Sequence, residues 1–288
     1  MLIELERGLH FQIVNLLKRV HQWQYHHRGR IPWSTGYWDY RNDFVRDVLH
    51  DASLCARFAS NQPLPAGYGY RLDERVVEYP WVISRLSDRA TRLLDAGSAL
   101  NFRFLLGHPA LSKKSVVLYT LASEHYTVLH DNVSYIYGDL RQTILRDQLF
   151  DEIVCISTLE HVGLDNTLIY TRDQRYNEAR VFDYRDVLRE FQRLLVPGGR
   201  LFLTAPYGKY ENHGWLQQFD RERLDDVFQI FDGKIEAQAF YRYTVDGWIL
   251  SNAADCAECE YYDVHAHAEH APDYAAAARA VACVALSR

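Results

Sequence analysis

His161 lies close along the chain to two carboxylates, Glu160 and Asp165. A histidine side chain titrates near neutral pH, and a neighbouring carboxylate can orient its ring and stabilise the charged form. This combination suits the removal of a proton from a reacting group. The alternative is a histidine bonded to the backbone as a structural residue, because the chain contains 13 histidines. The sequence therefore offers His161, Glu160 and Asp165 as a candidate catalytic group.

A second chemical pattern is the run RLLDAGSALN, in which a short apolar segment ends at Asp95 and turns at Gly97. Such a turn places backbone N–H groups and an acidic side chain at the edge of a parallel sheet, where nucleotide-type cofactors bind. Dinucleotide fingerprints contain further glycines, whereas Ala99 and Asn101 follow here. The pattern favours a cofactor without a diphosphate, the alternative being a turn that only joins a strand to a helix.

The third pattern is a cysteine pair followed by histidines, Cys256 and Cys259 with His265, His267 and His270. A tetrahedral zinc site permits this spacing. No turn glycines flank the pair, and the residues after it alternate like a strand. We therefore expect chance proximity in a histidine-rich loop and no bound metal.

The elements that would position these residues alternate between apolar strands and helices. The strand-like runs lie within residues 92–101, 116–119, 133–140, 150–161 and 194–204. A helix with one apolar face, residues 183–195, precedes the turn Pro197-Gly198-Gly199. Strands that alternate with helices predict an α/β fold with a doubly wound, mostly parallel sheet.

In order and spacing these runs resemble the class I S-adenosylmethionine-dependent methyltransferases. The motifs that carry the resemblance are LDAGSALN, YGDL, FDEIVCISTLEHVG and LLVPGGRLFLT, within residues 92–204. The resemblance implies a Rossmann-like, seven-stranded sheet whose last two strands form an antiparallel hairpin. It also implies S-adenosylmethionine as the cofactor.

The resemblance assigns the cofactor to the ends of the first four strands. The implied cofactor-binding residues are Asp95, Ala96, Gly97, Ser98, Thr120, Gly138, Asp139, Leu140 and Ser157. Thr120 stands where the family has a carboxylate for the ribose hydroxyls, with Glu124 a turn later. A threonine cannot accept two charge-assisted hydrogen bonds, which weakens binding by about 1 to 2 kcal/mol. Asp139 matches the contact with the adenine amino group, and its alternative role is to cap a turn.

The resemblance also places His161 beside the transferred methyl group and the acceptor. Methyl transfer to a hydroxyl needs a base, although proximity and orientation supply much of the rate. Loops rich in aromatic and polar residues suit a small or glycan-type hydroxylated acceptor, so we expect O-methylation. The candidate substrate-binding residues are Trp33, Tyr37, Tyr207 and His213. Trp33 and Tyr37 belong to an aromatic segment, residues 26–40, that forms a lid over the site or simply packs.

Composition and charge limit the kinds of molecule that the protein is expected to bind. The chain has 288 residues and a net charge of -6 without a basic stripe, which disfavours nucleic acid. No apolar run reaches the ~18 residues of a membrane span, and charged residues interrupt the apolar residues at the start. We expect a cytoplasmic protein that acts on small molecules.

Two domains are expected, an N-terminal helical cap and lid at residues 1–74 and a Rossmann-like domain at residues 75–288. An amphipathic helix near residues 5–24, with Leu5, Leu9, Ile13 and Leu16 on one face, caps the sheet, pairs in a homodimer, or lies on a membrane surface. The remaining predicted elements are helices at residues 42–59, 76–88 and 219–231 and strands at residues 234–243 and 280–286.

Two rival functions stay open from the sequence. A scaffold or partner subunit that has lost its cofactor would explain the sparse glycines and Thr120, whereas Asp95, Asp139 and His161 argue against it. A dinucleotide-dependent oxidoreductase is disfavoured by the missing glycines.

Overall fold

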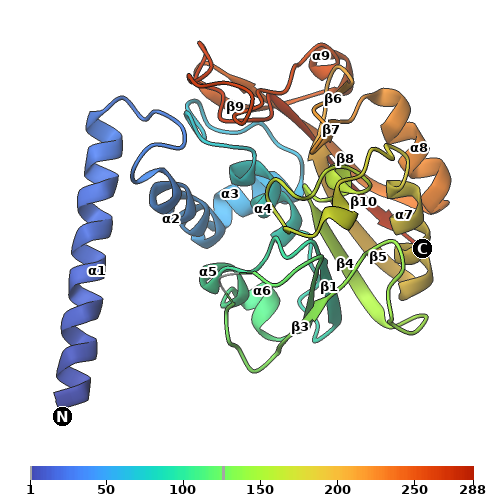
Figure 1. Cartoon of the computed structure of the whole chain (residues 1–288), viewed down its shortest axis with the longest axis horizontal. Coiled ribbons are helices and arrows are strands. Elements are labelled where there is room, and N and C mark those ends of the chain that lie inside the picture. The colour runs from blue at the N-terminus through green and yellow to red at the C-terminus, as the bar shows by residue number, and fades with distance from the viewer. Residues whose placement is uncertain (1, 125–126) are drawn as a thin grey trace.

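A mixed sheet of eight strands forms the centre of the computed structural model, which describes residues 2–124 and 127–288 (Figure 1). The strand order is β3-β2-β1-β4-β5-β10-β8-β9. The strands are β1 (Arg92–Ala96), β2 (Ser115–Thr120), β3 (Val133–Tyr137), β4 (Phe150–Ile156), β5 (Leu195–Pro206), β8 (Lys234–Thr244), β9 (Gly247–Ser251) and β10 (Ala280–Ser287). A separate short pair contains β6 (Glu211–Asn212) and β7 (Gln217–Gln218). Strands β1 to β5 run parallel, which confirms the predicted fold class.

The last three strands of the sheet are antiparallel to their neighbours, with β10 between β5 and β8. The expected antiparallel hairpin at this end is present, but the sheet has eight strands instead of the predicted seven. The eighth strand, β9, returns from β8 through a tight turn that pairs Thr244 with Gly247. Gly247 adopts a φ of 122°, a conformation that suits glycine, and this allows the chain to reverse and add one more edge strand.

Helices cover both faces of the sheet. They are α2 (Tyr37–His50), α3 (Ala52–Ala59), α4 (Arg75–Ile83), α5 (Arg103–Leu106), α6 (Pro109–Ser112), α7 (Tyr184–Leu194), α8 (Arg221–Phe231) and α9 (Ala253–Cys256). Neighbouring residues of β4 enter different hydrophobic clusters: Val154 packs with Trp81 of α4, and Cys155 packs with Phe191 of α7. This alternation is that of a strand buried on both faces. Two 3₁₀ turns, η1 (Leu159–His161) and η2 (Gln174–Tyr176), follow β4.

The helix predicted over residues 42–59 is two helices, α2 and α3, that meet at Asp51. Asp51 has an extended backbone, and its carboxylate accepts hydrogen bonds from the N–H groups of Ser53 and Leu54. This side chain caps the start of α3, which explains why the helical periodicity is interrupted here. The sequence prediction of one continuous helix was therefore wrong at this point.

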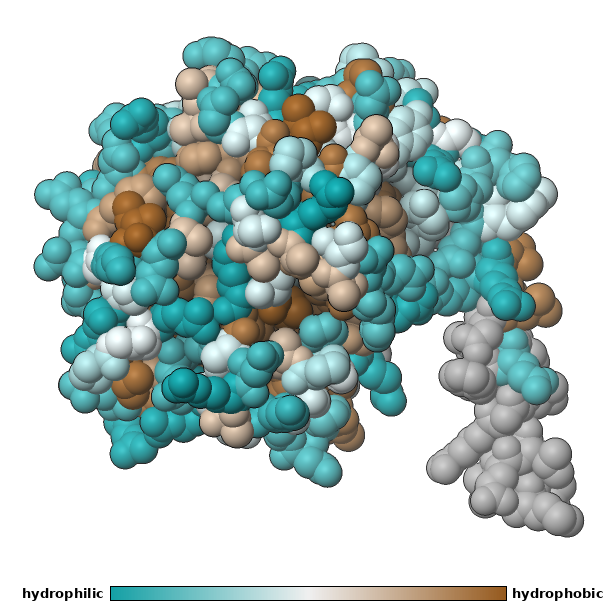
Figure 2. Space-filling model, turned by 180° about the vertical axis from the view of Figure 1, so that it is seen from behind, coloured by the Kyte–Doolittle hydropathy of each residue, from teal (hydrophilic) through white to brown (hydrophobic). Residues whose placement is uncertain are grey.

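The N-terminal helix α1 (Leu2–His27) stands away from the body of the molecule (Figure 1). Lys18 and Gln22 donate hydrogen bonds to Asp43 of α2, which attaches the C-terminal half of the helix. Leu16, Leu17 and Val20 are exposed, and Figure 2 shows apolar groups where the helix leaves the body. The side chains of Leu5, Leu9 and Ile13 lie outside the described residues. Pairing of this helix in a homodimer stays a prediction. Within residues 2–124 and 127–288, no helix is long and apolar enough to cross a membrane.

A buried carboxylate attaches α4 to the carboxyl ends of two strands. Glu78 Oε1 accepts hydrogen bonds from Ser157 Oγ (2.6 Å), directly after β4, and from Thr204 Oγ1 (2.7 Å) in β5. Glu78 Oε2 accepts one from Arg75 Nη1 (2.6 Å). Glu78 is fully buried, so each of these bonds replaces water that the carboxylate loses on folding.

Glu78→Gln should therefore lower the free energy of unfolding by about 2 to 4 kcal/mol. The amide keeps the size of the side chain but introduces a donor where hydroxyl and guanidinium donors converge. Urea denaturation measures the change. Glu222→Gln on the exposed start of α8 is the matched control and should stay within about 0.5 kcal/mol of the wild type. Equal stability of both variants would contradict this account.

Candidate functional site

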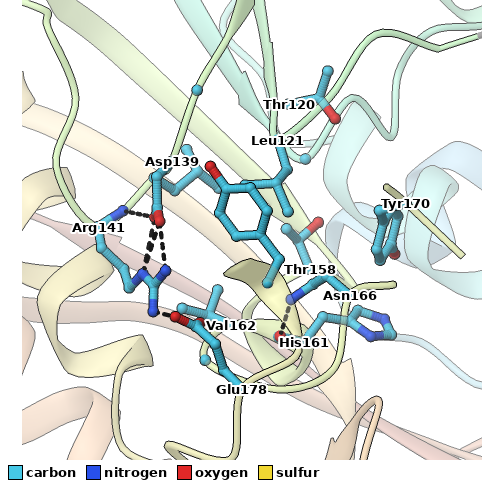
Figure 3. Close-up of a pocket in the computed structure, with 15 residues that line it drawn as sticks. Thr120, Leu121, Asp139, Arg141, Thr158, His161, Val162, Asn166, Tyr170 and Glu178 are labelled. Carbon is cyan, nitrogen blue, oxygen red and sulfur yellow. Dashed lines mark hydrogen bonds and ion pairs between the residues drawn. The ribbon is translucent and has the colours of Figure 1, made fainter. Parts of the chain in front are cut away.

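A small cavity lies at the carboxyl ends of the first four strands, lined by Gly97 after β1, Thr120 of β2, Asp139 after β3 and Thr158 after β4 (Figure 3). The space open to the centre of a water molecule is about 60 Å³. This is the edge at which parallel α/β sheets bind their ligands. Three of these four positions, Gly97, Thr120 and Asp139, were predicted from the sequence motifs, and the structure brings them close together.

The turn after β1 is organised by Asp95. Its carboxylate accepts hydrogen bonds from the N–H groups of Ala99 and Leu100, yet burial outweighs them and raises the pKa of Asp95 to about 7. Gly97 has a φ of 110°, and a Cβ atom there would overlap Thr158 Oγ1, so this position requires glycine. Ser98 also has a positive φ, and its buried Oγ has no hydrogen-bond partner among the described residues. Ala96 ends β1 in the core.

Asp139 is occupied by a neighbouring guanidinium. Arg141 donates to both oxygens of Asp139 and to Glu178 (Figure 3). It also donates to Asp183. Burial acts to raise the pKa of Asp139, but the hydrogen bonds from Arg141 hold it below its usual range. The carboxylate is thus ionised, and the hydrogen bonds that it accepts come from Arg141. Gly138 and Leu140 line the same cavity.

Thr120 lines the cavity, as the sequence motif implies, whereas Glu124 is drawn to a different partner. The Glu124 carboxylate accepts a 2.6 Å hydrogen bond from Asn101 Nδ2. Asn101 follows the cofactor turn, so Glu124 supports that turn from beyond β2. Ser157 does not line the first cavity, because its hydroxyl turns to Glu78 and its φ is 40°.

A second, larger cavity adjoins the first, with about 880 Å³ open to the centre of a water molecule. His161 and Tyr170 line both cavities and thus form a shared wall. Aromatic side chains dominate the second cavity. They include Trp33, Trp38, Tyr170, Trp215, Tyr261 and Tyr262. A large cavity with aromatic walls and a few polar groups is the usual form of a small-molecule site.

His161 is a neutral histidine in this structure. Its Nδ1 lies 2.9 Å from the carbonyl oxygen of Trp215, so the ring donates through Nδ1 and leaves Nε2 as an acceptor. Burial lowers the pKa of His161 to about 4. The sequence led us to expect titration near neutrality, but desolvation disfavours the charged ring.

Two carboxyl groups that line the second cavity together with His161 have unusual surroundings. Glu160 precedes it in η1, and Glu74 is the residue before α4; both line the second cavity. The Oε2 atom of each is buried without a hydrogen-bond partner among the described residues. Burial raises the pKa of both carboxyl groups to about 8, aided by neighbouring carboxylates and opposed by Arg75. Both are therefore protonated for most of the time at pH 7.

Several predicted residues lie elsewhere. Asp165 accepts hydrogen bonds from the N–H and hydroxyl of Thr167 and lines neither cavity. Tyr37 is buried in the N-terminal segment, where its hydroxyl accepts from Asp73 N–H. Tyr207 is buried against Phe240. Of the predicted substrate-binding residues, Trp33 lines the second cavity.

His213 and the cysteine pair lie near the second cavity. His213 packs on Tyr261, one of the cavity's lining residues. Cys256 and Cys259 are free and buried, while His265, His267 and His270 line the cavity. In the part of the chain that the structure describes, these side chains form no group that could hold a metal ion.

Sequence reasoning missed the contribution of α4. Glu74 and Arg75 line the second cavity, and Glu78 holds the strand ends behind it. The available signal was the charge pattern Asp-Glu-Arg-Val-Val-Glu at residues 73–78, which spans the start of an otherwise apolar helix. Two charged residues on one turn of a buried helix indicate partners elsewhere in the fold.

Residues 111–203, from α6 through most of β5, match the family model described as a methyltransferase domain. This match covers about a third of the 288 residues. No curated protein matches the chain. Strands β1 to β5 have the spatial order β3-β2-β1-β4-β5, and β1 lies before the matched residues.

Three solved structures illustrate what the chain is similar to. The [4+2]-cyclase SpnF is 15% identical, with 88% of this chain and 96% of that chain covered and a TM-score of 0.46. A putative methyltransferase from Bacillus halodurans is 11% identical, with 72% and 95% covered and a TM-score of 0.44. The 1,6-didemethyltoxoflavin-N1-methyltransferase from Burkholderia thailandensis is 12% identical, with 86% and 87% covered and a TM-score of 0.42.

The first cavity fits S-adenosylmethionine, the cofactor that the sequence motifs imply, in chemical character. Gly97 and Gly138 leave the backbone open at two strand ends, and Leu121, Leu140 and Val162 add apolar surface. Ser98, whose buried Oγ has no hydrogen-bond partner among the described residues, follows Gly97 but does not line this cavity. A ligand with both polar and flat apolar parts suits this lining.

The pH dependence of stability tests the burial of Glu160. Because its pKa is about 8 in the folded protein and about 4.3 in an unfolded chain, the folded state binds more protons between these values. Stability must then fall as pH rises through that window. Between pH 6.5 and 8, Glu160→Gln should remove about 1 to 2 kcal/mol of this fall, as measured by urea denaturation at both pH values. An unchanged fall in the variant would show that Glu160 is not desolvated.

Proposed function

We propose that the protein transfers the methyl group of S-adenosylmethionine to a small acceptor bound in the second cavity. The observation that carries the proposal is the wall shared by the two cavities, in which His161 and Tyr170 line both. A group in that wall can contact both the cofactor and the acceptor. Methyl transfer depends strongly on such proximity and alignment of the two reactants.

The cofactor residues follow the sequence motifs in this proposal. The turn at Asp95, Gly97 and Ser98 would hold the methionine part, and Thr120 the ribose hydroxyls. The adenine ring would lie near Gly138 and Leu140. A direct contact between adenine and Asp139 stays a prediction, because Arg141 already donates to both oxygens of that carboxylate.

When bound, S-adenosylmethionine supplies an electrophilic methyl group on a sulfonium centre. His161 Nε2 is a hydrogen-bond acceptor that can orient a hydroxyl of the acceptor toward that methyl group. A hydroxyl oxygen becomes much more acidic as it gains a methyl group, so even a weak base can receive its proton. The acceptor predicted from the sequence, a small or glycan-type molecule methylated on oxygen, is compatible with this arrangement.

The first test is binding of S-adenosylmethionine and S-adenosylhomocysteine to the full chain by isothermal titration calorimetry. Dissociation constants in the micromolar range are expected. No binding at millimolar ligand would overturn the proposal in favour of a scaffold that has lost its cofactor.

His161→Phe should lower methyl transfer by about 10- to 100-fold, since the ring loses its acceptor nitrogen but keeps its place against Trp215. Formation of S-adenosylhomocysteine with a panel of small hydroxylated aromatic acceptors measures the rate. Binding of S-adenosylhomocysteine should stay within about twofold. Because the pKa of His161 is about 4, wild-type turnover should show no inflection near pH 6.5. Equal loss of binding and turnover would contradict the assigned role.

Thr120→Asp should tighten S-adenosylhomocysteine binding by about tenfold, because a carboxylate can accept two charge-assisted hydrogen bonds from ribose hydroxyls. Thr120→Val is the matched control, which fills similar volume without an acceptor and should weaken binding. Calorimetry measures both variants. If aspartate weakens binding as valine does, Thr120 does not face the ribose.

A further inference from the structure

Two carboxyl groups line the second cavity without a protein partner for one oxygen each. Glu74 is 9% exposed and Glu160 1% exposed, and the Oε2 atom of both is buried without a hydrogen bond among the described residues. The Glu78 carboxylate raises the pKa of both groups, and the Glu74 carboxylate also raises the pKa of Glu160. Buried polar atoms normally have partners, so these two oxygens indicate a group that the protein alone does not supply.

Arg75, the cation that lowers the pKa of Glu74 and Glu160, is already hydrogen-bonded to another carboxylate. Arg75 donates its 2.6 Å hydrogen bond to Glu78, whose two oxygens are fully used by Arg75, Ser157 and Thr204. His161 is neutral and donates to the Trp215 carbonyl. Among the described residues no cation is hydrogen-bonded to Glu74 or Glu160, although Arg75 lowers the pKa of both. An anionic acceptor would be repelled once either carboxyl group ionises.

The aromatic part of the cavity presents rings more than polar atoms. Trp33 Nε1 donates to the carbonyl oxygen of Ala276 (2.8 Å), and Trp215 Nε1 donates to Asp263 Oδ2 (3.1 Å). With their N–H groups used inside the protein, both indoles offer ring surface to the cavity. Aromatic faces beside carboxylates attract organic cations.

We propose that the acceptor carries a protonated amine, which the carboxylates of Glu74 and Glu160 bind while the aromatic side chains pack against its hydrocarbon part. This substrate class rests on the proposed function and deepens it. Binding of the cation supplies the missing hydrogen bonds to both buried oxygens and stabilises the ionised carboxylates. A hydroxylated acceptor that also carries an amine meets both requirements.

Three probes with one ring and different end groups test the proposal: phenethylamine, 2-phenylethanol and phenylacetate. Isothermal titration calorimetry uses the full chain, with and without saturating S-adenosylhomocysteine. Phenethylamine should bind at least about tenfold more tightly than 2-phenylethanol, and phenylacetate should not bind measurably. Equal affinity for the amine and the alcohol, tighter binding of the carboxylate, or no binding of any probe at 10 mM (on the order of the weakest specific binding) would overturn the proposal.

Glu74→Gln and Glu160→Gln should each reduce phenethylamine affinity by about tenfold and leave 2-phenylethanol affinity unchanged. Glu236→Gln, on the exposed part of β8, is the control and should leave both affinities unchanged. Retained binding of S-adenosylhomocysteine shows that each variant is folded. Titration of the wild type with S-adenosylhomocysteine tests the proposed function separately. If the wild type does not bind this ligand, the affinities of the three probes measured without it still decide whether the cavity prefers an amine.

Discussion

The arrangement of both cavities depends on the buried carboxylate of Glu78. A charge inside a protein is stable only where several donors surround it, and Glu78 receives donors from α4, from the end of β4 and from β5. These bonds set the height of α4 above the strand ends. They place Arg75 and Glu74 at the second cavity, and they hold Ser157 at a φ of 40°. The chain then enters η1 with Glu160 and His161 directed to the site.

The sheet could be predicted from the sequence because its signals are local. Apolar strands ending at Asp95, Asp139 and Ser157 each specify their own edge, and the fold class and methyltransferase domain followed from their order. The second cavity could not be predicted, because the contacts behind it join distant segments: Glu78 meets Ser157 79 residues later and Thr204 126 residues later. The sequence of a helix does not indicate which strand end will pack against that helix.

Burial changes the protonation states of residues whose place near the site was predicted from the sequence. His161 was recognised as a strand-end residue, but its ordinary pKa was assumed, whereas desolvation keeps it neutral. Glu160 was read as a charge that assists His161, yet burial favours its protonated form. Asp165 was grouped with them by sequence proximity, although its carboxylate turns to Thr167. Spacing along the chain predicts which groups are near a site, and solvent exclusion decides what each of them does there.

The hydrogen bond between Trp33 and the Ala276 carbonyl spans 243 positions along the chain. The second cavity thus has lining residues from near both ends of the sequence. The residues that line the first cavity all lie between Gly97 and Glu178, in the middle of the chain. During synthesis on a ribosome, every side chain of the first cavity emerges before the residues that complete the second. Strand β10 is also made last, although it lies between β5 and β8. The order of translation therefore separates the two cavities in time, because the residues of the first cavity are all synthesised before those that complete the second.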